Sequence, residues 1–148
     1  MKRRLALTCV VALFAHAAGA FALDYGSVAT PSAILYDGPS LKAKKLYVVS
    51  RYTPLELVVN LSEWIKVRSQ DGALAWAEKR AIASTRYVVV TAALADVRQS
   101  PDPAAALVFQ ARKQVALELL ESSGTGWLKV RHADGNVGYI RALDAWGG

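Results

Sequence analysis

Residues 64–76 read WIKVRSQDGALAW, and residues 127–139 read WLKVRHADGNVGY. In both segments apolar and polar residues alternate on either side of an Asp-Gly pair, which begins at Asp71 in the first segment and at Asp134 in the second. Alternation of this kind is typical of a strand that buries one face. An Asp-Gly pair between two such runs is a strong signal for a tight turn. Each segment therefore predicts a β-hairpin.

The likeness between the two segments extends upstream, which makes the chain a tandem repeat. The two hairpins lie 63 residues apart, whereas the Leu-Glu-Leu runs at 55–57 and 117–119 lie 62 apart, so one extra residue precedes the second hairpin. A unit of this length fits a small independent domain better than one turn of a solenoid. We place the first repeat at residues 24–84 and the second at residues 85–148. No Pro-, Gly- or Ser-rich linker separates them, so we expect the repeats to touch.

Short strands and turns account for the rest of each repeat. Pro39, Pro101 and Pro103 mark an irregular loop near the start of each repeat. The Ala-rich stretches 91–95 and 104–111 resemble helices in composition, but their place in the repeat favours strand and loop. We expect five short strands per repeat in a sheet that closes on itself, because closure removes exposed edges. The expected fold class is all-β, with two tandem small β-barrels.

The first 22 residues are predicted to form a secretory signal peptide. Lys2, Arg3 and Arg4 precede an uncharged apolar run, and small residues follow it up to Ala22. The apolar run is too short to span a bilayer. We expect cleavage after Ala22, with cleavage after Ala20 as the second candidate, and a periplasmic or secreted product that has no membrane segment.

Removal of this segment would leave few reactive side chains. It contains the one Cys, and its loss lowers the formal charge from +6 to +3. The mature chain then has no disulfide, thiolate nucleophile or cysteine metal site. So small a charge on an exported chain argues against a nucleic-acid partner. His132, the one remaining histidine, could be a base or a ligand, but we interpret it as a solvated strand residue beside Asp134.

The second repeat resembles the bacterial SH3 (SH3b) domain family. The likeness rests on an Arg-x-x-Pro start at 98–101, an apolar strand over 115–121, Gly-Trp-x-Lys-Val at 126–130 and Asp-Gly-x-x-Gly-Tyr-Ile at 134–140. The resemblance implies an SH3-like barrel with a binding rather than a catalytic role. Related modules often accompany cell-wall hydrolases and help them to recognise peptidoglycan, and others lie in envelope proteins.

The first repeat resembles the family less closely. It has Tyr36 at the position of Arg98, and Ala75 where the second repeat keeps Gly138. These differences bear on any binding site in the first repeat rather than on its fold. We therefore expect that the two repeats need not bind the same ligand.

Aromatic side chains are the best candidates for a binding surface. Trp64 and Trp127 recur, and alternation places each on the strand face opposite its apolar neighbours, where an indole ring suits a peptide or a sugar. The resemblance also implies a groove at this position, whereas the alternative is a structural Trp that caps one end of the barrel. Trp76 and Tyr139 fit a structural role better. The full candidate set is Trp64, Trp127, Tyr36, Tyr139, Trp76, Arg98, Lys129 and Arg131.

The basic residues beside the tryptophans have two interpretations. Lys66 and Arg68 in the first repeat match Lys129 and Arg131 in the second. They could contact the carboxylates of wall peptides. They could equally be solvated residues with cross-strand partners.

The leading hypothesis is an exported, non-catalytic binding or adaptor protein of the cell envelope that recognises peptidoglycan peptides or a partner protein. A second hypothesis is a purely structural interaction subunit with no small ligand, and a remote third is an envelope hydrolase. The sequence has no nucleophile elbow, phosphate loop or repeated pair of close carboxylates. We therefore expect no enzyme activity, no cofactor and no metal.

Overall fold

The structure, a computed structural model, describes residues 24–148. The predicted signal peptide at residues 1–22 and its cleavage site lie outside the described residues. Within residues 24–148 every regular element is a strand or a three-residue 3₁₀ helix, so the all-β class is confirmed. In the same range there is no helix of the length and apolarity that a membrane crossing requires.

Seven strands of the first repeat form one sheet. Their order in space is β3-β2-β6-β5-β4-β1-β7, and neighbouring strands pair antiparallel. A 3₁₀ helix, η1 (Lys79–Ala81), leads into the last strand. The strands are β1 (Tyr25–Val28), β2 (Ser32–Tyr36), β3 (Lys45–Ser50), β4 (Pro54–Asn60), β5 (Trp64–Arg68), β6 (Leu74–Glu78) and β7 (Ile82–Ala83).

The second repeat forms a second sheet with the same topology. Its order is β10-β9-β13-β12-β11-β8-β14, which is the order of the first sheet strand for strand. The 3₁₀ helix η2 (Ala142–Asp144) is the counterpart of η1. The strands are β8 (Tyr87–Val90), β9 (Leu94–Arg98), β10 (Leu107–Arg112), β11 (Ala116–Ser122), β12 (Trp127–Arg131), β13 (Val137–Arg141) and β14 (Ala145–Trp146).

The structure differs from the expected strand count, with seven strands per repeat in place of five. The short closing strands β7 and β14 have two residues each, which is too few to show alternation in a sequence. The strands at the two ends of a sheet, β3 with β7 and β10 with β14, are not paired to each other in the part of the chain that the structure describes. Closure of each sheet into a barrel therefore stays a prediction.

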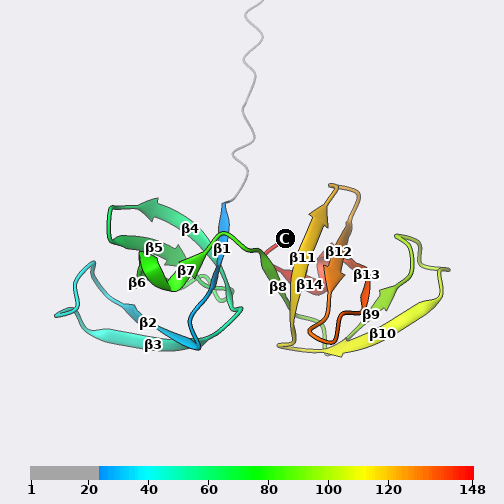
Figure 1. Cartoon of the computed structure of the whole chain (residues 1–148), viewed down its shortest axis with the longest axis horizontal. Helices are drawn as coiled ribbons and strands as arrows, with labels where there is room; N and C mark the ends of the chain where they lie inside the picture. The colour runs from blue at the N-terminus through cyan, green and yellow to red at the C-terminus, as the bar shows by residue number, and fades with distance from the viewer. Residues whose placement is uncertain (1–23) are drawn as a thin grey trace, which may run out of the picture.

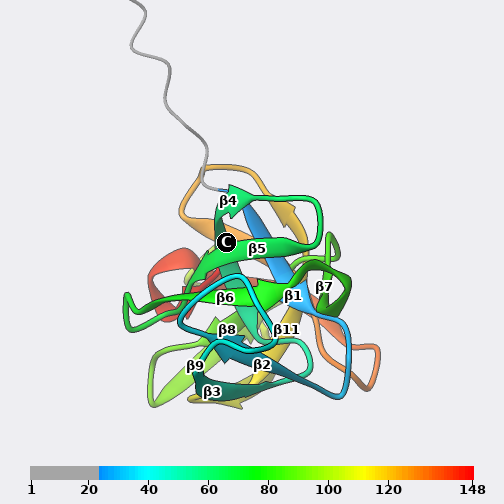
Figure 2. The ribbon, with the colours of Figure 1, turned by 90° about the vertical axis from the view of Figure 1, so that its left-hand side faces the viewer.

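The repeats lie side by side as two lobes (Figure 1). The first lobe runs from blue to green and the second from green to red, with β1 and β8 between them. Figure 2 shows the same arrangement from the side of the first lobe, which lies in front of the second. The end strands β3 and β10 run along the same side of the two lobes (Figure 1).

Each repeat has an apolar core of its own, and the two cores use equivalent positions. Leu55 and Val67 are completely buried in the first core, and their counterparts Leu117 and Val130 are completely buried in the second. Burial alternates along β5 and β12, so that the neighbours of each strand-initial Trp are buried while the Trp is half-buried. The alternation of apolar and polar residues in the sequence therefore matches the alternation of buried and half-buried side chains along these strands.

The two Asp-Gly pairs form the predicted hairpin turns. Gly72 has φ 85° and Gly135 has φ 94°, in the left-handed region that glycine adopts at little cost. The Asp71 carboxylate accepts hydrogen bonds from the Ser69 hydroxyl and the Ala73 N–H, and these lower the pKa of Asp71. The pKa of Asp134 is lowered chiefly by the Asn136 N–H. Both carboxylates are therefore ionised turn residues.

The repeats touch through aromatic side chains, as the short connection between them predicts. The rings of Tyr25 in β1 and Trp146 in β14 pack edge to face with centroids 5.4 Å apart. Those of Tyr52 and Tyr87 stack at 4.4 Å. The backbone N–H of Tyr87 donates a hydrogen bond of 3.1 Å to the hydroxyl of Ser27, which is buried.

We predict that Gly138→Ala destabilises the second repeat. A Cβ at this position would lie 2.7 Å from Val97 Cγ1 and 2.8 Å from the Arg98 carbonyl oxygen. Overpacking of this kind costs about 1–3 kcal/mol, so the midpoint of thermal unfolding should fall. Gly38→Ala is the matched control, because its Cβ would meet only Ala43 Cβ at 3.6 Å. Equal midpoints for the two variants would contradict the close packing of β13 on β9.

We also predict that stability falls in alkali because of two tyrosines at the contact between the repeats. Burial is the main cause that raises the pKa of both Tyr25 and Tyr87. The native state therefore retains protons that the unfolded chain loses above about pH 10. Their stabilisation is complete below that pH and is lost as the pH rises through the raised pKa values. Between pH 8 and 11 the midpoint of thermal unfolding should fall more steeply with pH for the natural chain than for a Tyr25→Phe/Tyr87→Phe variant. The same dependence of the midpoint on pH in both proteins would contradict the prediction.

Candidate functional site

A small cleft in the second repeat contains two of the predicted site residues. Its volume is about 320 Å³, and it lies between the start of β12, the end of β13, strand β9 and η2. Trp127 and Arg141, which both line it, are cross-strand partners, and the guanidinium of Arg141 lies 5.6 Å from the centre of the Trp127 ring. The residues that line it are Leu94, Asp96, Arg98, Pro103, Trp127, Arg141, Leu143 and Asp144.

Arg98 is held in a fixed orientation at this cleft. Its guanidinium donates to the Asp96 carboxylate at 2.6 Å and to the Ala105 carbonyl at 2.8 Å. The second bond ties the side chain to the Pro-containing loop after β9. An arginine that is already oriented loses less side-chain entropy when it binds an anion.

The cleft combines three kinds of contact in a small volume. Arg98 and Arg141 offer planar donor groups that match carboxylates. Asp96 and Asp144 offer acceptors for ammonium or amide N–H groups, and the Trp127 ring offers a flat apolar surface. A site of this composition can bind a small molecule or a peptide segment that carries both a carboxylate and N–H donors.

The same position in the first repeat is filled by an aromatic pair. Tyr36 takes the place of Arg98, as their strand partners show: Tyr36 pairs with Trp76, and Arg98 pairs with Tyr139. From its place beside the Pro39 loop in the sequence, Tyr36 is predicted to lie in that loop and to extend a groove. It instead ends β2 and exposes only 3% of its surface. Its ring packs edge to face on Trp64 at 5.4 Å, which explains its burial.

The other predicted site residues do not line the cleft. Lys129 lies 6.0 Å from the centre of the Tyr139 ring, as Lys66 lies 5.8 Å from that of Trp76. Arg131 donates two hydrogen bonds, of 3.0 and 3.1 Å, to Glu118 on β11.

The first repeat has the same kind of ion pair. Arg68 donates to both carboxylate oxygens of Glu56 at 2.8 and 2.9 Å. The recurring basic pairs therefore have partners within their own sheets, which matches the second of the two interpretations drawn from the sequence.

Sequence reasoning missed Arg141, Asp96 and Asp144. Arg141 could have been found by counting the register of the second hairpin, since the residue that pairs with Trp127 must lie close to its ring. In the first repeat the partner of Trp64 is Glu78, which is ion-paired with Arg80 at 2.7 Å. The two repeats thus have opposite charges beside their equivalent tryptophans.

His132 lies in the second hairpin turn, outside the cleft. Its Nδ1 is 3.0 Å from an oxygen of Asp134, and its ring centre is 5.5 Å from that of Phe109. Among residues 24–148 there is no group of three or more His, Cys, Asp or Glu side chains placed to hold a metal ion.

Several solved structures are similar to this chain. NlpC2 from Trichomonas vaginalis has 15% sequence identity and a TM-score of 0.40, and the match covers 84% of this chain and 48% of that one. NlpC1 from the same organism has 13% identity and a TM-score of 0.40, with 93% and 50% covered. An NlpC/P60 family protein from Bacillus cereus ATCC 10987 has 14% identity and a TM-score of 0.38, with 82% and 55% covered. This chain spans about half the length of these proteins. No curated protein matches it.

Two family models match the chain, one in each repeat. A model described as "Bacterial SH3 domain" matches residues 29–83, and a second with the same description matches residues 92–144. Each match falls on one of the two seven-stranded sheets, and together they cover most of the described residues. The chain therefore belongs to the bacterial SH3 domain family and carries two tandem copies of the domain.

Proposed function

We propose that this protein is a non-catalytic binding or adaptor protein of the cell envelope, periplasmic or secreted, and that its second repeat binds cell-wall peptides in the Trp127 cleft. Membership of the bacterial SH3 family supports a role in binding at the envelope. The observation that carries the proposal is the placement of the Trp127 ring in one cleft with two guanidinium groups, those of Arg98 and Arg141.

The chemistry of the cleft matches that of a short peptide with free charged groups. A carboxylate would be bound by the two arginines, and a nearby ammonium or amide N–H by the carboxylates of Asp96 and Asp144. An apolar side chain of the peptide would lie on the Trp127 ring. The volume of about 320 Å³ is at the small end of ligand sites, which fits a few residues rather than a folded domain.

The purely structural alternative is less well supported. That hypothesis places the Trp-bearing faces against each other or against a second copy. The contact between the repeats is formed instead by Tyr25, Tyr52, Tyr87 and Trp146. Trp127 lies beside Arg141 and lines the cleft.

Calorimetric titration of the protein with soluble muropeptides tests the proposal. We expect saturable binding that Trp127→Ala and Arg141→Gln each weaken by about tenfold or more, the effect of losing about 1.4 kcal/mol from a bidentate or stacked contact. Arg141 is exposed, so Arg141→Gln should leave the fold intact, which circular dichroism checks. Mass spectrometry should recover the muropeptides unchanged.

Two variants serve as controls. Arg131→Gln makes the same change of charge on the same sheet, outside the cleft, and Trp64→Ala removes the equivalent Trp of the first repeat. Both should bind within about twofold of the natural chain, as expected for residues outside the contact. Absence of binding, equal losses in Arg131→Gln and Arg141→Gln, or cleavage of the muropeptides would each count against the proposal.

A further inference from the structure

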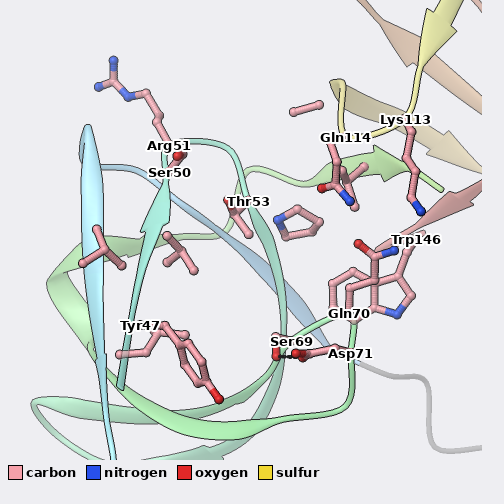
Figure 3. A pocket seen from close by; sticks show the side chains of 16 residues that line it. Tyr47, Ser50, Arg51, Thr53, Ser69, Gln70, Asp71, Lys113, Gln114 and Trp146 are labelled. Atoms are coloured by element: carbon pink, nitrogen blue, oxygen red, sulfur yellow. Dashed lines mark hydrogen bonds between the residues drawn. The ribbon is translucent and has the colours of Figure 1, made fainter. Parts of the chain in front are cut away.

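A second cleft lies between the two repeats, away from Trp127, and is larger than the Trp127 cleft. Its volume is about 700 Å³. One wall is formed by β3 and the turn after β5, with Tyr47, Ser50 and Asp71, and the other by Lys113, Gln114 and Trp146 of the second repeat (Figure 3). The cleft exists only because the repeats are in contact.

The first wall of this cleft includes the edge of a strand. Four consecutive residues of β3, 47–50, line the cleft. Successive side chains of a strand point to opposite faces, so a cavity lined by four in a row meets the edge. β3 is the end strand of its sheet, and β2 is its one hydrogen-bonded neighbour among residues 24–148. Alternate backbone N–H and C=O groups along such an edge are available to form hydrogen bonds with another strand.

This edge is unusually apolar for an exposed strand. Leu46, Tyr47 and Val48 expose 36%, 49% and 72% of their surface. Natural proteins usually protect an edge of this kind with charged or bulged residues. In β3 these features, Lys45 and a register shift, are confined to its start, whereas residues 47–50 pair regularly with β2 and have no charged side chain. An uncovered apolar edge beside a cleft is a template for strand addition.

The equivalent strand of the second repeat shows that the fold does not require these residues. Val48 pairs with Ile34, and its counterpart Gln110 pairs with Asp96. Gln110 donates a hydrogen bond of 2.8 Å to Asp96, so this position is polar in the second repeat. Phe109, the counterpart of Tyr47, packs against the second core. The end strand of the second repeat also exposes an apolar residue, Leu107, at 49%, but it lacks the exposed pair Tyr47 and Val48.

The charges around β3 select the kind of strand that can be added. Lys44 and Lys45 lie at its start, Arg51 follows its end, and Lys113 lies across the cleft. The one acidic side chain that lines the cleft, Asp71, is hydrogen-bonded within its own turn. A strand with acidic residues at its ends would be attracted to this edge.

Self-pairing of two copies through β3 is disfavoured by the same charges. An antiparallel pair would bring Lys45 of one copy to the Arg51 end of the other. A parallel pair would place Lys45 beside Lys45. Like charges directly opposite each other destabilise a strand pair, which leaves a different polypeptide as the occupant.

We propose that the edge of β3, along the cleft between the repeats, binds an extended acidic segment of a partner polypeptide as an added strand of the first sheet. This site is separate from the Trp127 cleft and does not rest on the function proposed for it. The second repeat contributes Lys113, Gln114 and Trp146 as the opposite wall, so the site requires both repeats.

Fluorescence anisotropy with a short labelled peptide of alternating Glu and Val residues tests this site. We expect saturable binding that weakens with salt, and much weaker binding of a peptide with Lys in place of Glu. Val48→Glu should weaken binding by about tenfold or more, because it places a like charge on the edge. Val48→Gln, which introduces the residue that the second repeat has at this position, should weaken it less. Amide exchange should slow at alternate residues of β3 when the acidic peptide is bound.

The controls separate this site from the other surfaces of the protein. Leu107→Glu makes the same change on the exposed edge of β10 and should leave binding within about twofold, as should Trp127→Ala. Equal affinity for the acidic and basic peptides, equal losses in Leu107→Glu and Val48→Glu, or unchanged amide exchange in β3 would overturn the proposal. A dimer in sedimentation that Val48→Glu dissociates would also overturn it, because the edge would then be covered by a second copy.

Discussion

The edge-to-face contact between Tyr25 and Trp146 holds the first strand of one repeat against the last strand of the other. An aromatic pair contributes only about 0.5–1.5 kcal/mol beyond the area it buries. It is reinforced by the stacked rings of Tyr52 and Tyr87 and by the hydrogen bond from Tyr87 to buried Ser27. The connection from β7 to β8 is only residues 84–86, so the two surfaces meet at a high effective concentration and a modest contact energy is enough. The walls of the cleft between the repeats depend on this contact.

Duplication has produced two sheets with one topology and different surfaces. The buried positions are equivalent, because each sheet must fill the same small core. The positions around the strand-initial Trp are free of that constraint. There the first repeat has Tyr36, buried against Trp64, whereas the second has Arg98, which is anchored by Asp96 and by the loop after β9. The first copy thus has an apolar contact at the position where the second has a guanidinium group.

The sequence predicts the hairpins because their signals are local. Alternation along residues 64–68 and 127–131 reports which side chains face the core, and the Asp-Gly pairs fix the turns. The two-residue strands β7 and β14 could not be predicted, since each is defined by backbone pairing with the first strand of its own sheet. Tyr36 was misplaced for a related reason. The pattern of its neighbours indicates a loop, but its contact with Trp64 involves a residue 28 positions away.

The two clefts differ in predictability because they differ in how far apart their residues lie in the chain. Two of the eight residues that line the Trp127 cleft, Arg98 and Trp127, belong to segments that the family pattern marks, and Arg141 follows from strand register. The cleft between the repeats joins β3 to Lys113 and Trp146, and no local pattern brings these segments together. It arises from the relative position of the two sheets, which the sequence does not encode in any single motif. The apolar run 46–48 in the end strand β3 is only a weak sequence signal for it, because the end strand β10 also begins with an apolar run, residues 107–109. A strand that is apolar on both sides is expected in the middle of a covered sheet. On the open edge of β3 the same pattern fits the added strand proposed above.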